Sequence, residues 1–396
     1  MNQRFIATIA RTTATTVENY VVQIDTVLIK VASRCNINCS YCYVYNMGDS
    51  SWEDMPNFVS RNTITAIADN LAKVSASQSK PFAVVLHGGE PLLIGVRRLE
   101  NLLQELRAVL PEKHPIGIQS NGMLISEPIL DICAKYKVSI SVSLDGPQEV
   151  NDVSRVGHKG EGTYAKVVAG IEKLKAHPDS AFLFSGLLAV IDPHSSPIAM
   201  YQFFKSTGAK SVDFLYRDGN HDKLPFGKTS FFSTEYGEWL TGLSEAYLND
   251  RNPIRIRIVD DCIRLLLGGR GVKEGIGITD FGIVVIDTDG TITKNDTLKS
   301  NFAGADRFSE ALNVNTHDLL EVFNTSEFGL SHALQRPTSP DCKNCPQLAV
   351  CGGGMPLHRW SNSNEYNNPS VYCSDQKHFI NHIKKKIHYL IQEKLN

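Results

Sequence analysis

Three cysteines stand close together near the start of the chain, at Cys35, Cys39 and Cys42. They follow the apolar, β-branched run Val27–Val31, which favours a strand that ends in a cysteine-rich loop. Thiolates are the soft ligands that iron–sulfur clusters require, and three of them, rather than four, would leave one coordination position for another ligand. The alternatives are a zinc knuckle or a redox-active CX2C pair, but no histidine or fourth cysteine lies nearby in the sequence to complete a closed zinc site.

The spacing CX3CX2C, with Tyr41 directly before the third cysteine, resembles the signature of the radical S-adenosylmethionine (SAM) enzymes. The resemblance implies that Cys35, Cys39 and Cys42 hold a 4Fe–4S cluster whose open iron binds the amino and carboxylate groups of SAM. One-electron reduction would then cleave SAM to methionine and a 5′-deoxyadenosyl radical. It also implies an electron donor such as flavodoxin or ferredoxin. Tyr41 is expected against the adenine, where aromatic stacking is worth roughly 1–3 kcal/mol.

The composition limits the classes of protein to which the chain can belong. Its 396 residues, 42% hydrophobic and 21% charged, are typical of a globular protein with two or three domains. A formal net charge of −2 offers no basic surface for nucleic acid. No apolar run reaches the roughly 18 to 20 residues of a membrane span, and the N-terminus has no signal-peptide core. We therefore expect a cytoplasmic protein with neither nucleic acid nor membrane as partner, whose cysteines bind metal rather than form disulfides.

Short apolar runs alternate with amphipathic segments from Thr26 onward. Strands are predicted at Val27–Val31, Phe82–Leu86, Ile116–Gln119, Ser139–Leu144, Phe182–Val190 and Val212–Tyr216. Helices are predicted at Arg61–Ser75, Arg97–Leu110, Glu127–Tyr136, Tyr164–Ala176 and Ser196–Thr207. Six β-then-α units with buried strands predict an α/β fold with a parallel sheet, here a partial (β/α)6 barrel of the TIM type. In such barrels the chemistry lies at the C-terminal ends of the strands.

The second predicted strand ends in the sequence His87-Gly88-Gly89-Glu90-Pro91. A glycine pair lets the backbone approach a ligand closely, and a glutamate can accept hydrogen bonds from an ammonium group. A simple turn is the alternative. In the radical SAM family a GGEP element at this place holds the amino group of SAM, so the resemblance assigns Gly88, Gly89 and Glu90 to that role.

Polar residues also follow the third and fourth predicted strands. Gln119 and Asn121 put two amides at the expected barrel mouth, where we predict contacts to SAM. Ser143 and Arg155 follow the next strand, where a polar turn before a helix is the alternative. The segment Ser143–Tyr164 resembles the matching segment of peptide-modifying radical SAM enzymes. This resemblance implies that Ser143 contacts the ribose of SAM and Arg155 its carboxylate.

A second group of cysteines stands near the C-terminus, at Cys342, Cys345, Cys351 and Cys373. Four thiolates that begin with a CX2C pair indicate a metal site, and the residues alone fit either zinc or an iron–sulfur cluster. The pattern CX2CX5C with a late cysteine resembles the SPASM extension, the C-terminal domain of radical SAM enzymes that modify peptides. The resemblance implies that these four cysteines hold an auxiliary 4Fe–4S cluster.

The chain departs from the fuller SPASM pattern at two positions. Asn295 and Met355 stand where that pattern has cysteine ligands of a further cluster, so we expect one auxiliary cluster and not two. Cys262 is either a relic of the lost site or a core thiol, and Cys133 is expected to be a small buried residue. In related enzymes an aspartate at the position of Asp296 takes a proton from the substrate, which implies a catalytic role; an exposed hairpin aspartate is the alternative.

A narrower resemblance covers Cys351–Trp360 and Glu365–Asp375, which are similar to the SPASM maturases of the FxsB type. These enzymes act on ribosomally made peptides, and several relatives join an aromatic ring carbon to a nearby β-carbon, which makes a cyclophane. The resemblance implies that the chain abstracts a β-hydrogen from a precursor peptide and forms a carbon–carbon cross-link to an aromatic side chain. Thioether formation, epimerisation and sulfatase-type oxidation of serine or cysteine are alternatives, as is a non-catalytic, zinc-stabilised binding protein.

The domain organisation follows from these elements. We predict an N-terminal arm over residues 1–25, a radical SAM partial barrel over 26–220, a helical connector over 221–280, a SPASM-type domain over 281–377 and a C-terminal helix over 378–396. Within the fourth of these, the apolar runs around Asp287–Gly290 predict a β-hairpin. The arm is too short for a separate domain that recognises a leader peptide.

Overall fold

The computed structural model describes residues 22–395, which divide into two compact units. Unit 1 consists of the described residues up to Leu144 together with Asp152–Ser185 and Phe281–Ala333. Unit 2 consists of Asp145–Asn151, Gly186–Asp280 and the described residues from Leu334 onward. All but the last four residues of the predicted N-terminal arm lie outside the described residues. The five predicted domains stay a prediction, because a division by compactness does not test where folding domains begin.

Unit 1 is built on parallel strands. β1 (Ile24–Ala32), β2 (Ala83–Gly88), β3 (Ile116–Ser120) and β4 (Val138–Ser143) pair in this order, and all are parallel. β8 (Gly282–Ile286) pairs in parallel with the other edge of β1, and β9 (Ile292–Thr293) pairs antiparallel with β8. The parallel strands and the hairpin are as predicted. The pairing of β8 with β1 was not predicted, because no local pattern reports a partner more than 250 residues away.

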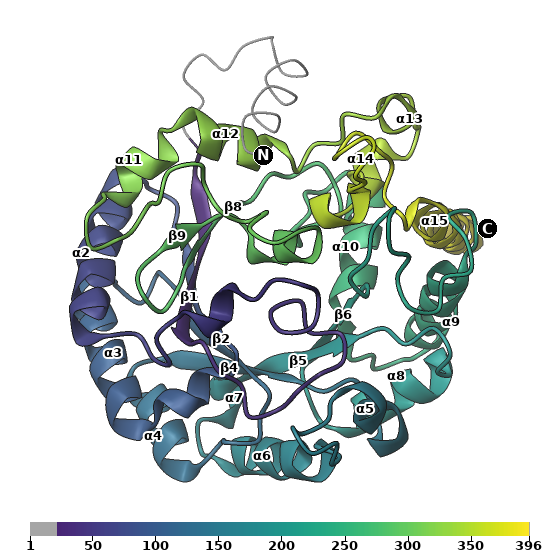
Figure 1. Cartoon of the computed structure of the whole chain (residues 1–396). Coiled ribbons are helices and arrows are strands. Elements are labelled where there is room, and N and C mark those ends of the chain that lie inside the picture. The colour runs from purple at the N-terminus through teal and green to yellow at the C-terminus, as the bar shows by residue number, and fades with distance from the viewer. Residues whose placement is uncertain (1–21, 396) are drawn as a thin grey trace. The chain divides into compact units, whose positions relative to one another are not determined.

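The two faces of these strands differ in polarity. On β1 the side chains of Val27, Ile29 and Val31 are fully buried, and Figure 1 shows helices along the outer side of the unit 1 strands. These helices are α2 (Arg61–Ser77), α3 (Val96–Val109), α4 (Glu127–Lys135) and α6 (Tyr164–Ala176). On the opposite face of β3 and β4, Gln119 and Ser143 are only half-buried. The alternation leaves a polar inner face at the carboxyl ends of the strands, where barrel enzymes place their chemistry.

Unit 2 has a smaller set of parallel strands. β5 (Phe184–Val190), which enters this unit at Gly186, pairs with β6 (Ser211–Leu215), and β6 pairs with β7 (Arg255–Ile256). Its longer helices are α8 (Pro197–Ser206), α9 (Glu235–Leu248), α10 (Arg257–Leu266) and α15 (Cys373–Leu395). The remaining short helices of the described chain are η1 (Ser51–Glu53), η2 (Pro91–Ile94), α5 (Gln148–Ser154), α7 (Ser180–Leu183), η3 (Asp296–Ser300), α11 (Leu319–Phe323), α12 (Ser326–Ala333), α13 (Pro340–Lys343), α14 (Leu348–Cys351) and η4 (Pro356–Arg359).

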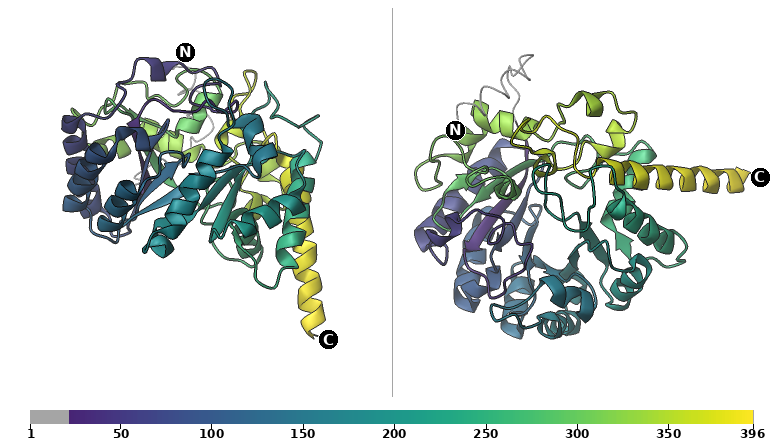
Figure 2. Two further views of the ribbon diagram at one scale, coloured as in Figure 1. Left: turned by 90° about the horizontal axis from the view of Figure 1, so that it is seen from below. Right: turned by 45° about the vertical axis from the view of Figure 1, so that its right-hand side comes forward.

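The C-terminal helix begins five residues earlier than predicted, at Cys373 rather than residue 378. A buried contact explains the early start. Asp375 accepts hydrogen bonds from the backbone N–H groups of Tyr236 and Gly237, each at 2.9 Å, and pairs with Lys228 at 2.6 Å. Asp375 therefore caps the first turn of α9 and fixes the first turn of α15 beside it. Figure 2 shows α15 as one long helix whose last turns extend beyond α9.

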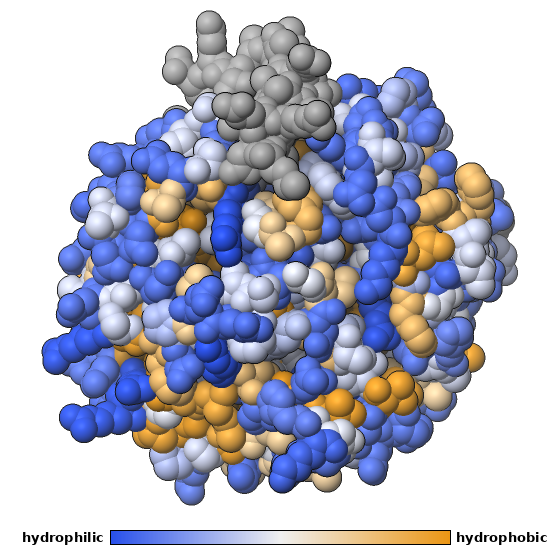
Figure 3. All heavy atoms as spheres, viewed as in Figure 1, coloured by the Kyte–Doolittle hydropathy of each residue, from blue (hydrophilic) through white to orange (hydrophobic). Residues whose placement is uncertain are grey.

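The surface is mixed in character. On the face that Figure 3 shows, hydrophilic residues are interspersed with smaller groups of hydrophobic ones. None of the described helices combines the length and the apolar character that crossing a membrane requires.

Candidate active site and metal centres

The loop that follows β1 carries Cys35, Cys39 and Cys42, and hydrogen bonds to another segment of unit 1 fix its path. The N–H of Asn38 donates to the carbonyl of Val156 at 2.7 Å, and the N–H of Ser40 donates to the carbonyl of Ser154 at 2.9 Å. These two bonds flank Arg155, so they place its side chain beside the cysteine loop. The loop is therefore held by the two neighbours of Arg155, the residue predicted to contact the SAM carboxylate.

The three thiols suit an iron–sulfur cluster. None is in a disulfide, and burial raises the pKa of Cys35 to about 12 and that of Cys42 to about 11, with each neighbouring thiolate adding to the shift. Thiols that repel one another as thiolates need a cationic centre to stay ionised. Within residues 22–395, no group of three His, Cys, Asp or Glu side chains converges on a single ion. A 4Fe–4S cluster binds each thiolate through a different iron, so such convergence is not required.

The Gly88–Gly89 pair at the end of β2 packs against this loop. The N–H of Gly89 donates to the carbonyl of Ala32 at 2.9 Å, and the N–H of Glu90 donates to the carbonyl of Arg34 at 3.0 Å. A Cβ on Gly88 would lie 2.0 Å from the oxygen of Ala32, and one on Gly89 would lie 2.3 Å from that of Arg34. The glycines are thus required for contact with the cysteine loop itself, in addition to the ligand contact that the sequence predicts.

The side chain of Glu90 is fully buried and joins neighbouring segments by hydrogen bonds. Its carboxylate accepts hydrogen bonds from the N–H of Leu92 at 3.0 Å, the hydroxyl of Ser120 at 2.8 Å and the N–H of Asn121 at 2.7 Å. Burial raises its pKa. An ionised carboxylate has about four lone-pair sites, so three scaffold bonds leave room for the predicted ammonium contact. That contact stays a prediction.

The other predicted SAM-contacting residues form two groups in unit 1. The Gln119 side-chain amide donates to the Ser143 hydroxyl at 2.8 Å on the inner face of the strands. Asn121 donates to the side chain of Asn36 at 2.7 Å and lies 3.9 Å from the sulfur of Cys35. These contacts place Asn121 beside the cysteine loop and Gln119 beside Ser143.

Arg155 and Tyr41, predicted to contact different parts of SAM, are themselves hydrogen-bonded: a guanidinium nitrogen of Arg155 donates to the Tyr41 hydroxyl at 3.0 Å. The structure therefore places Gln119 and Ser143 together at the ends of β3 and β4, and Tyr41, Asn121 and Arg155 on or beside the cysteine loop. Their individual roles toward SAM stay predictions.

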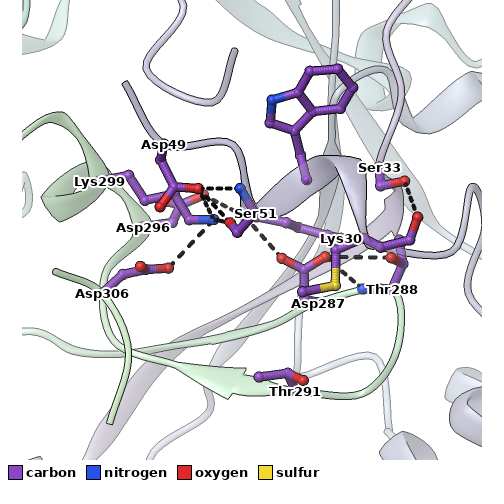
Figure 4. A network of polar contacts seen from close by, with 12 residues as sticks. Lys30, Ser33, Asp49, Ser51, Asp287, Thr288, Thr291, Asp296, Lys299 and Asp306 are labelled. Carbon is purple, nitrogen blue, oxygen red and sulfur yellow. Dashed lines mark hydrogen bonds and ion pairs between the residues drawn. The ribbon is translucent and has the colours of Figure 1, made fainter. Parts of the chain in front are cut away.

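A buried network of charges lies at the ends of β1 and β8 (Figure 4). The Lys30 ammonium is 3.3 Å from Oδ2 of Asp287 and 3.4 Å from Oδ2 of Asp296. Tyr43, the residue after Cys42, donates its hydroxyl to Oδ2 of Asp296 at 3.1 Å. Asp296 is 2% exposed, which excludes the alternative of an exposed hairpin aspartate.

Opposing effects set the protonation of this network. Burial alone would raise the pKa of Asp296, but the charges of Lys30 and Lys299, together with the hydrogen bond from Tyr43, hold it below its ordinary value. Burial alone would lower the pKa of Lys30, but Asp296 and Asp287 outweigh it and leave that pKa raised. At neutral pH the pair is therefore ionised.

His87 belongs to the same region. It is the direct partner of Lys30 in the β1–β2 register, so the two side chains are neighbours on one face of the strands. Its Nδ1 is a buried atom with no hydrogen-bond partner in the described part of the chain. Burial lowers the pKa of His87, so the imidazole is neutral at pH 7.

A second lysine extends the network. Lys299 in η3 lies 3.7 Å from Asp49 and 3.6 Å from Asp306, and donates to the hydroxyl of Ser51 at 2.9 Å (Figure 4). Burial raises the pKa of Asp306.

Sequence reasoning missed the charged residues of this network other than Asp296. Two of them carried a usable signal, since Lys30 interrupts the apolar run Val27–Val31 and Asp287 directly follows the apolar strand β8.

In unit 2 the structure brings together Cys342 in α13, Cys345 just after it, Cys351 at the end of α14 and Cys373 at the start of α15. None is in a disulfide. Burial raises the pKa of Cys351 to about 12, and the thiolates of the other three cysteines add to the shift. Four thiolates that repel one another need a cationic centre, such as a metal ion or an iron–sulfur cluster, to stay ionised, as in unit 1.

The glycines after Cys351 let another loop approach these thiols. Gly352 has φ +68°, and a Cβ there would lie 1.9 Å from the carbonyl oxygen of Gly277. The N–H of Gly277 in turn donates to the carbonyl of Val350 at 2.8 Å. The two remaining cysteines, Cys133 in α4 and Cys262 in α10, are fully buried core residues.

Comparison with known proteins finds similarity to radical SAM proteins and to sulfatase-maturating enzymes. The family model described as the Radical SAM superfamily matches residues 29–188. A cysteine-type anaerobic sulfatase-maturating enzyme of Clostridium perfringens is 25% identical over 374 residues, which cover 89% of this chain and 94% of that protein. The comparisons do not support the narrower FxsB-type expectation.

Two solved structures share the fold. Native anSMEcpe with bound AdoMet and Cp18Cys peptide is 21% identical, with a TM-score of 0.78 over 93% of this chain and 99% of that one. Streptococcus suis SuiB bound to precursor peptide SuiA is 16% identical, with a TM-score of 0.58 over 93% and 79%. These likenesses confirm the predicted α/β fold with a partial barrel.

The match over residues 29–188 includes the CX3CX2C loop and the GGEP segment that packs on it. The expectation of SAM and 4Fe–4S clusters as cofactors is confirmed at this level. Residues 29–188 thus match the Radical SAM superfamily, and the relatives that match along most of the chain are similar to it over both groups of cysteines.

Proposed function

We propose that this chain is a radical SAM enzyme that oxidises a side chain of a ribosomally made peptide. The observation that carries the proposal is the position of Asp296, a buried carboxylate hydrogen-bonded to Tyr43, the residue that follows the third cluster cysteine. A carboxylate that can accept a proton is thus hydrogen-bonded directly to a side chain of the cysteine loop. The sulfatase-maturating relative, which matches along nearly the whole chain, supports a peptide substrate.

Sulfatase-type oxidation at the β-carbon of a cysteine or serine is the favoured reaction. Loss of a hydrogen atom from the β-carbon, a proton from the thiol or hydroxyl and one electron converts CH–XH to C=X, a two-electron oxidation that balances. Carbon–carbon cross-linking to an aromatic ring is the second candidate. Its support is the resemblance of Cys351–Asp375 to cyclophane-forming maturases and the departure from the fuller SPASM pattern at Asn295 and Met355.

Cys35, Cys39 and Cys42 would hold the 4Fe–4S cluster, which together with SAM supplies a radical able to take a hydrogen atom from an unactivated carbon. The residues at the strand ends have the tasks of binding and orienting. In this proposal Glu90 and Arg155 bind the amino and carboxylate groups of SAM, and Gln119, Asn121, Ser143 and Tyr41 orient its nucleoside. Cys342, Cys345, Cys351 and Cys373 would hold one auxiliary 4Fe–4S cluster, whose chemistry is to accept or pass single electrons.

Asp296 accepts the proton at a carboxylate oxygen. Lys30 keeps this carboxylate ionised before the reaction, and Tyr43 fixes its orientation. Because Lys30 also lowers the basicity of Asp296, the substrate proton must be made acidic by loss of the neighbouring hydrogen atom before the transfer is favourable.

Mass spectrometry of candidate peptides after anaerobic turnover tests the reaction. We expect a product two hydrogens lighter that reacts with a hydrazine when the peptide contains serine, and the corresponding aldehyde after hydrolysis when it contains cysteine. A product two hydrogens lighter that requires an aromatic residue and does not react with hydrazine would favour the cross-link instead. SAM cleavage without any change in such peptides would contradict the proposal.

The Asp296→Asn variant tests the proton acceptor. We expect SAM cleavage to continue while product formation falls by roughly 10²–10⁴-fold, the usual contribution of general base catalysis. Asp289→Asn is the control, because Asp289 lies in the same hairpin but only orders its turn through Thr291. Equal product formation by Asp296→Asn and wild type would show that Asp296 is not the acceptor.

A further inference from the structure

Arg359 is a charged residue without an acidic partner in the interior of unit 2. Its side chain is 1% exposed, and it is the largest of the fully buried side chains. One guanidinium nitrogen donates to the carbonyl of Leu334. Within the described part of the chain its Nε has no hydrogen-bond partner, and no carboxylate is among the groups that act most strongly on its charge. One hydrogen bond to a carbonyl offsets only a small part of the free energy that burial of a cation costs.

The cost of such an arrangement indicates a missing anion. A buried guanidinium that lacks a counter-charge costs several kcal/mol, and buried charges in proteins are as a rule paired. The acidic groups that act on Arg359 are the thiols of Cys342 and Cys351 and the phenol of Tyr366. A phenol is neutral at pH 7, so the anion has to come from the cysteines.

The other charges near the four cysteines are either already paired or exposed: the buried Asp375, two residues after Cys373, is paired with Lys228 at 2.6 Å. Lys377 is hydrogen-bonded to the thiol of Cys373, and Asp341 acts on both Cys342 and Cys373, but both of these side chains lie at the surface. Water screens surface charges, whereas a buried charge acts through a low dielectric. Arg359 is therefore a fully buried cation, without an ion-pair partner among the described residues, that acts on Cys342 and Cys351.

We propose that Arg359 is the buried counter-charge of the group held by Cys342, Cys345, Cys351 and Cys373, and that it raises the reduction potential of that group. The proposal rests on the auxiliary cluster of the proposed function. A 4Fe–4S cluster with four thiolates carries about two net negative charges when oxidised and about one more when reduced. A fixed positive charge stabilises the more negative, reduced form. Arg359 thus makes the cluster a better acceptor for one electron.

The test uses a protein in which only the C-terminal site can hold a cluster. In the parent, Cys35, Cys39 and Cys42 are all changed to alanine. Arg359→Gln removes the charge, and Arg359→Lys keeps it. Arg336→Gln is the matched control, because it removes a guanidinium of unit 2 that is 42% exposed and paired with Asp280. After anaerobic reconstitution, iron and sulfide are measured and the midpoint potential is found by titration monitored by electron paramagnetic resonance.

We expect Arg359→Gln to have a more negative midpoint than the parent, Arg359→Lys to recover most of the difference, and Arg336→Gln to match the parent. A full cluster with an unchanged midpoint in Arg359→Gln would overturn the proposal, and so would an Arg359→Lys midpoint as negative as that of Arg359→Gln. If Arg359→Gln holds no cluster, the iron content of Arg359→Lys decides: recovery supports the role of charge, and none overturns it.

Zinc without sulfide in the parent would mean that the auxiliary-cluster part of the proposed function has failed. The counter-charge proposal is then tested separately by the rate at which a chelator removes zinc. Four thiolates around zinc are also anionic, so Arg359→Gln should lose zinc faster than Arg359→Lys and Arg336→Gln. Equal rates for the three variants would overturn it.

Discussion

The cysteine loop of unit 1 packs against polar side chains that hydrogen-bond to one another, whereas the four cysteines of unit 2 combine a run of glycines and one buried guanidinium with direct side-chain hydrogen bonds, such as that from the Cys351 thiol to Gln376 at 3.0 Å. Around Cys35, Asn121 and Arg155 take part in contacts that a ligand could replace. Around Cys351, the run after Gly352 brings backbone close, and Arg359 supplies a fixed charge.

This difference matches the number of thiols at each site. Three thiolates leave a coordination position that a substrate can occupy, so that site needs adaptable polar groups beside it. Four thiolates can complete a cluster without a further ligand, so that site needs only close packing around it. In our proposal the charge of Arg359 sets its reduction potential. The two sites thus have different requirements, although both begin from a short loop rich in cysteine.

Removal of cysteines should separate the sites most sharply. Cys35→Ala should abolish SAM cleavage, measured as 5′-deoxyadenosine, while Cys351→Ala should leave cleavage intact and stop product formation. Anaerobically purified wild type should hold roughly eight iron atoms per chain, and each variant roughly four. An iron content near twelve in wild type would contradict the single auxiliary cluster.

Replacement of two buried lysines should show that the ion pair of Lys30 contributes to product formation, whereas the ion pair of Lys228 contributes only to stability. Lys30→Met and Lys228→Met each leave a buried carboxylate unpaired, so each should lower the free energy of unfolding by about 3–5 kcal/mol. Lys30→Met should also reduce product formation per SAM cleaved, because Asp296 loses its counter-charge, whereas Lys228→Met should not. An unchanged ratio in Lys30→Met would separate that pair from catalysis.

The pH dependence of the Lys30 pair has a definite sign. The pKa of Asp296 is lowered in the folded protein, so its contribution to stability is present above the unfolded pKa, about 3.9, and is lost as the pH falls through the folded value. The stability difference between wild type and Lys30→Met, measured by urea unfolding, should therefore shrink below about pH 4. A constant difference down to pH 3 would mean that Asp296 is not the partner that matters.

Glycine variants should damage each site separately. Gly89→Ala places a methyl group against the carbonyl of Arg34, and Gly352→Ala places one against that of Gly277, so each should cost about 1–3 kcal/mol or more. Each should also lose roughly the four iron atoms of its own site. Gly329→Ala in α12, where nothing lies within 4 Å of the added carbon, is the control. Loss of both clusters in either variant would mean that the two sites are coupled in folding.

The smallest effect is expected for a helix cap next to the unit 1 site. One oxygen of Asp152 accepts the N–H groups of Thr163 and Tyr164, both at 2.9 Å, at the start of α6. Asp152→Ala should cost about 1 kcal/mol, measured by thermal unfolding, because Asp152 is only half-buried and water can replace part of its hydrogen bonding. Asp375→Ala in unit 2 should cost more, since Asp375 is buried and paired with Lys228. If Asp152→Ala lowered stability more than Asp375→Ala, burial would not be what sets the contribution of these two caps.

The sequence predicts most of the local structure. The predicted second, third and fourth strands lie within two residues of the observed bounds, the first starts three residues late, and α6 matches at both ends, because hydrophobic periodicity is a local property. The C-terminal helix was predicted to start too late, since the contact of Asp375 with α9 comes from distant residues.

The candidate site likewise combines residues that the sequence predicts with residues that only the folded structure brings together. The cysteines and the strand-end residues Gly89 and Asn121 are recognisable from spacing and position. The ion pair between Lys30 and Asp287 is not, because it depends on β8 lying beside β1, which only the assembled sheet determines. The bracing role of Glu90 was likewise hidden, since its three donors come from two separate segments.

The pairing of β1 with β8 also decides when this protein can complete its fold during synthesis. Lys30 leaves the ribosome 257 residues before Asp287, which is on the order of ten to fifty seconds at about 5–20 residues per second. During that interval the strand that leads into the radical-forming loop has an unpaired lysine where a buried ion pair will later stand. The nascent chain therefore has its cluster cysteines in place well before the carboxylate that would receive the substrate proton, and contacts of such long range slow folding.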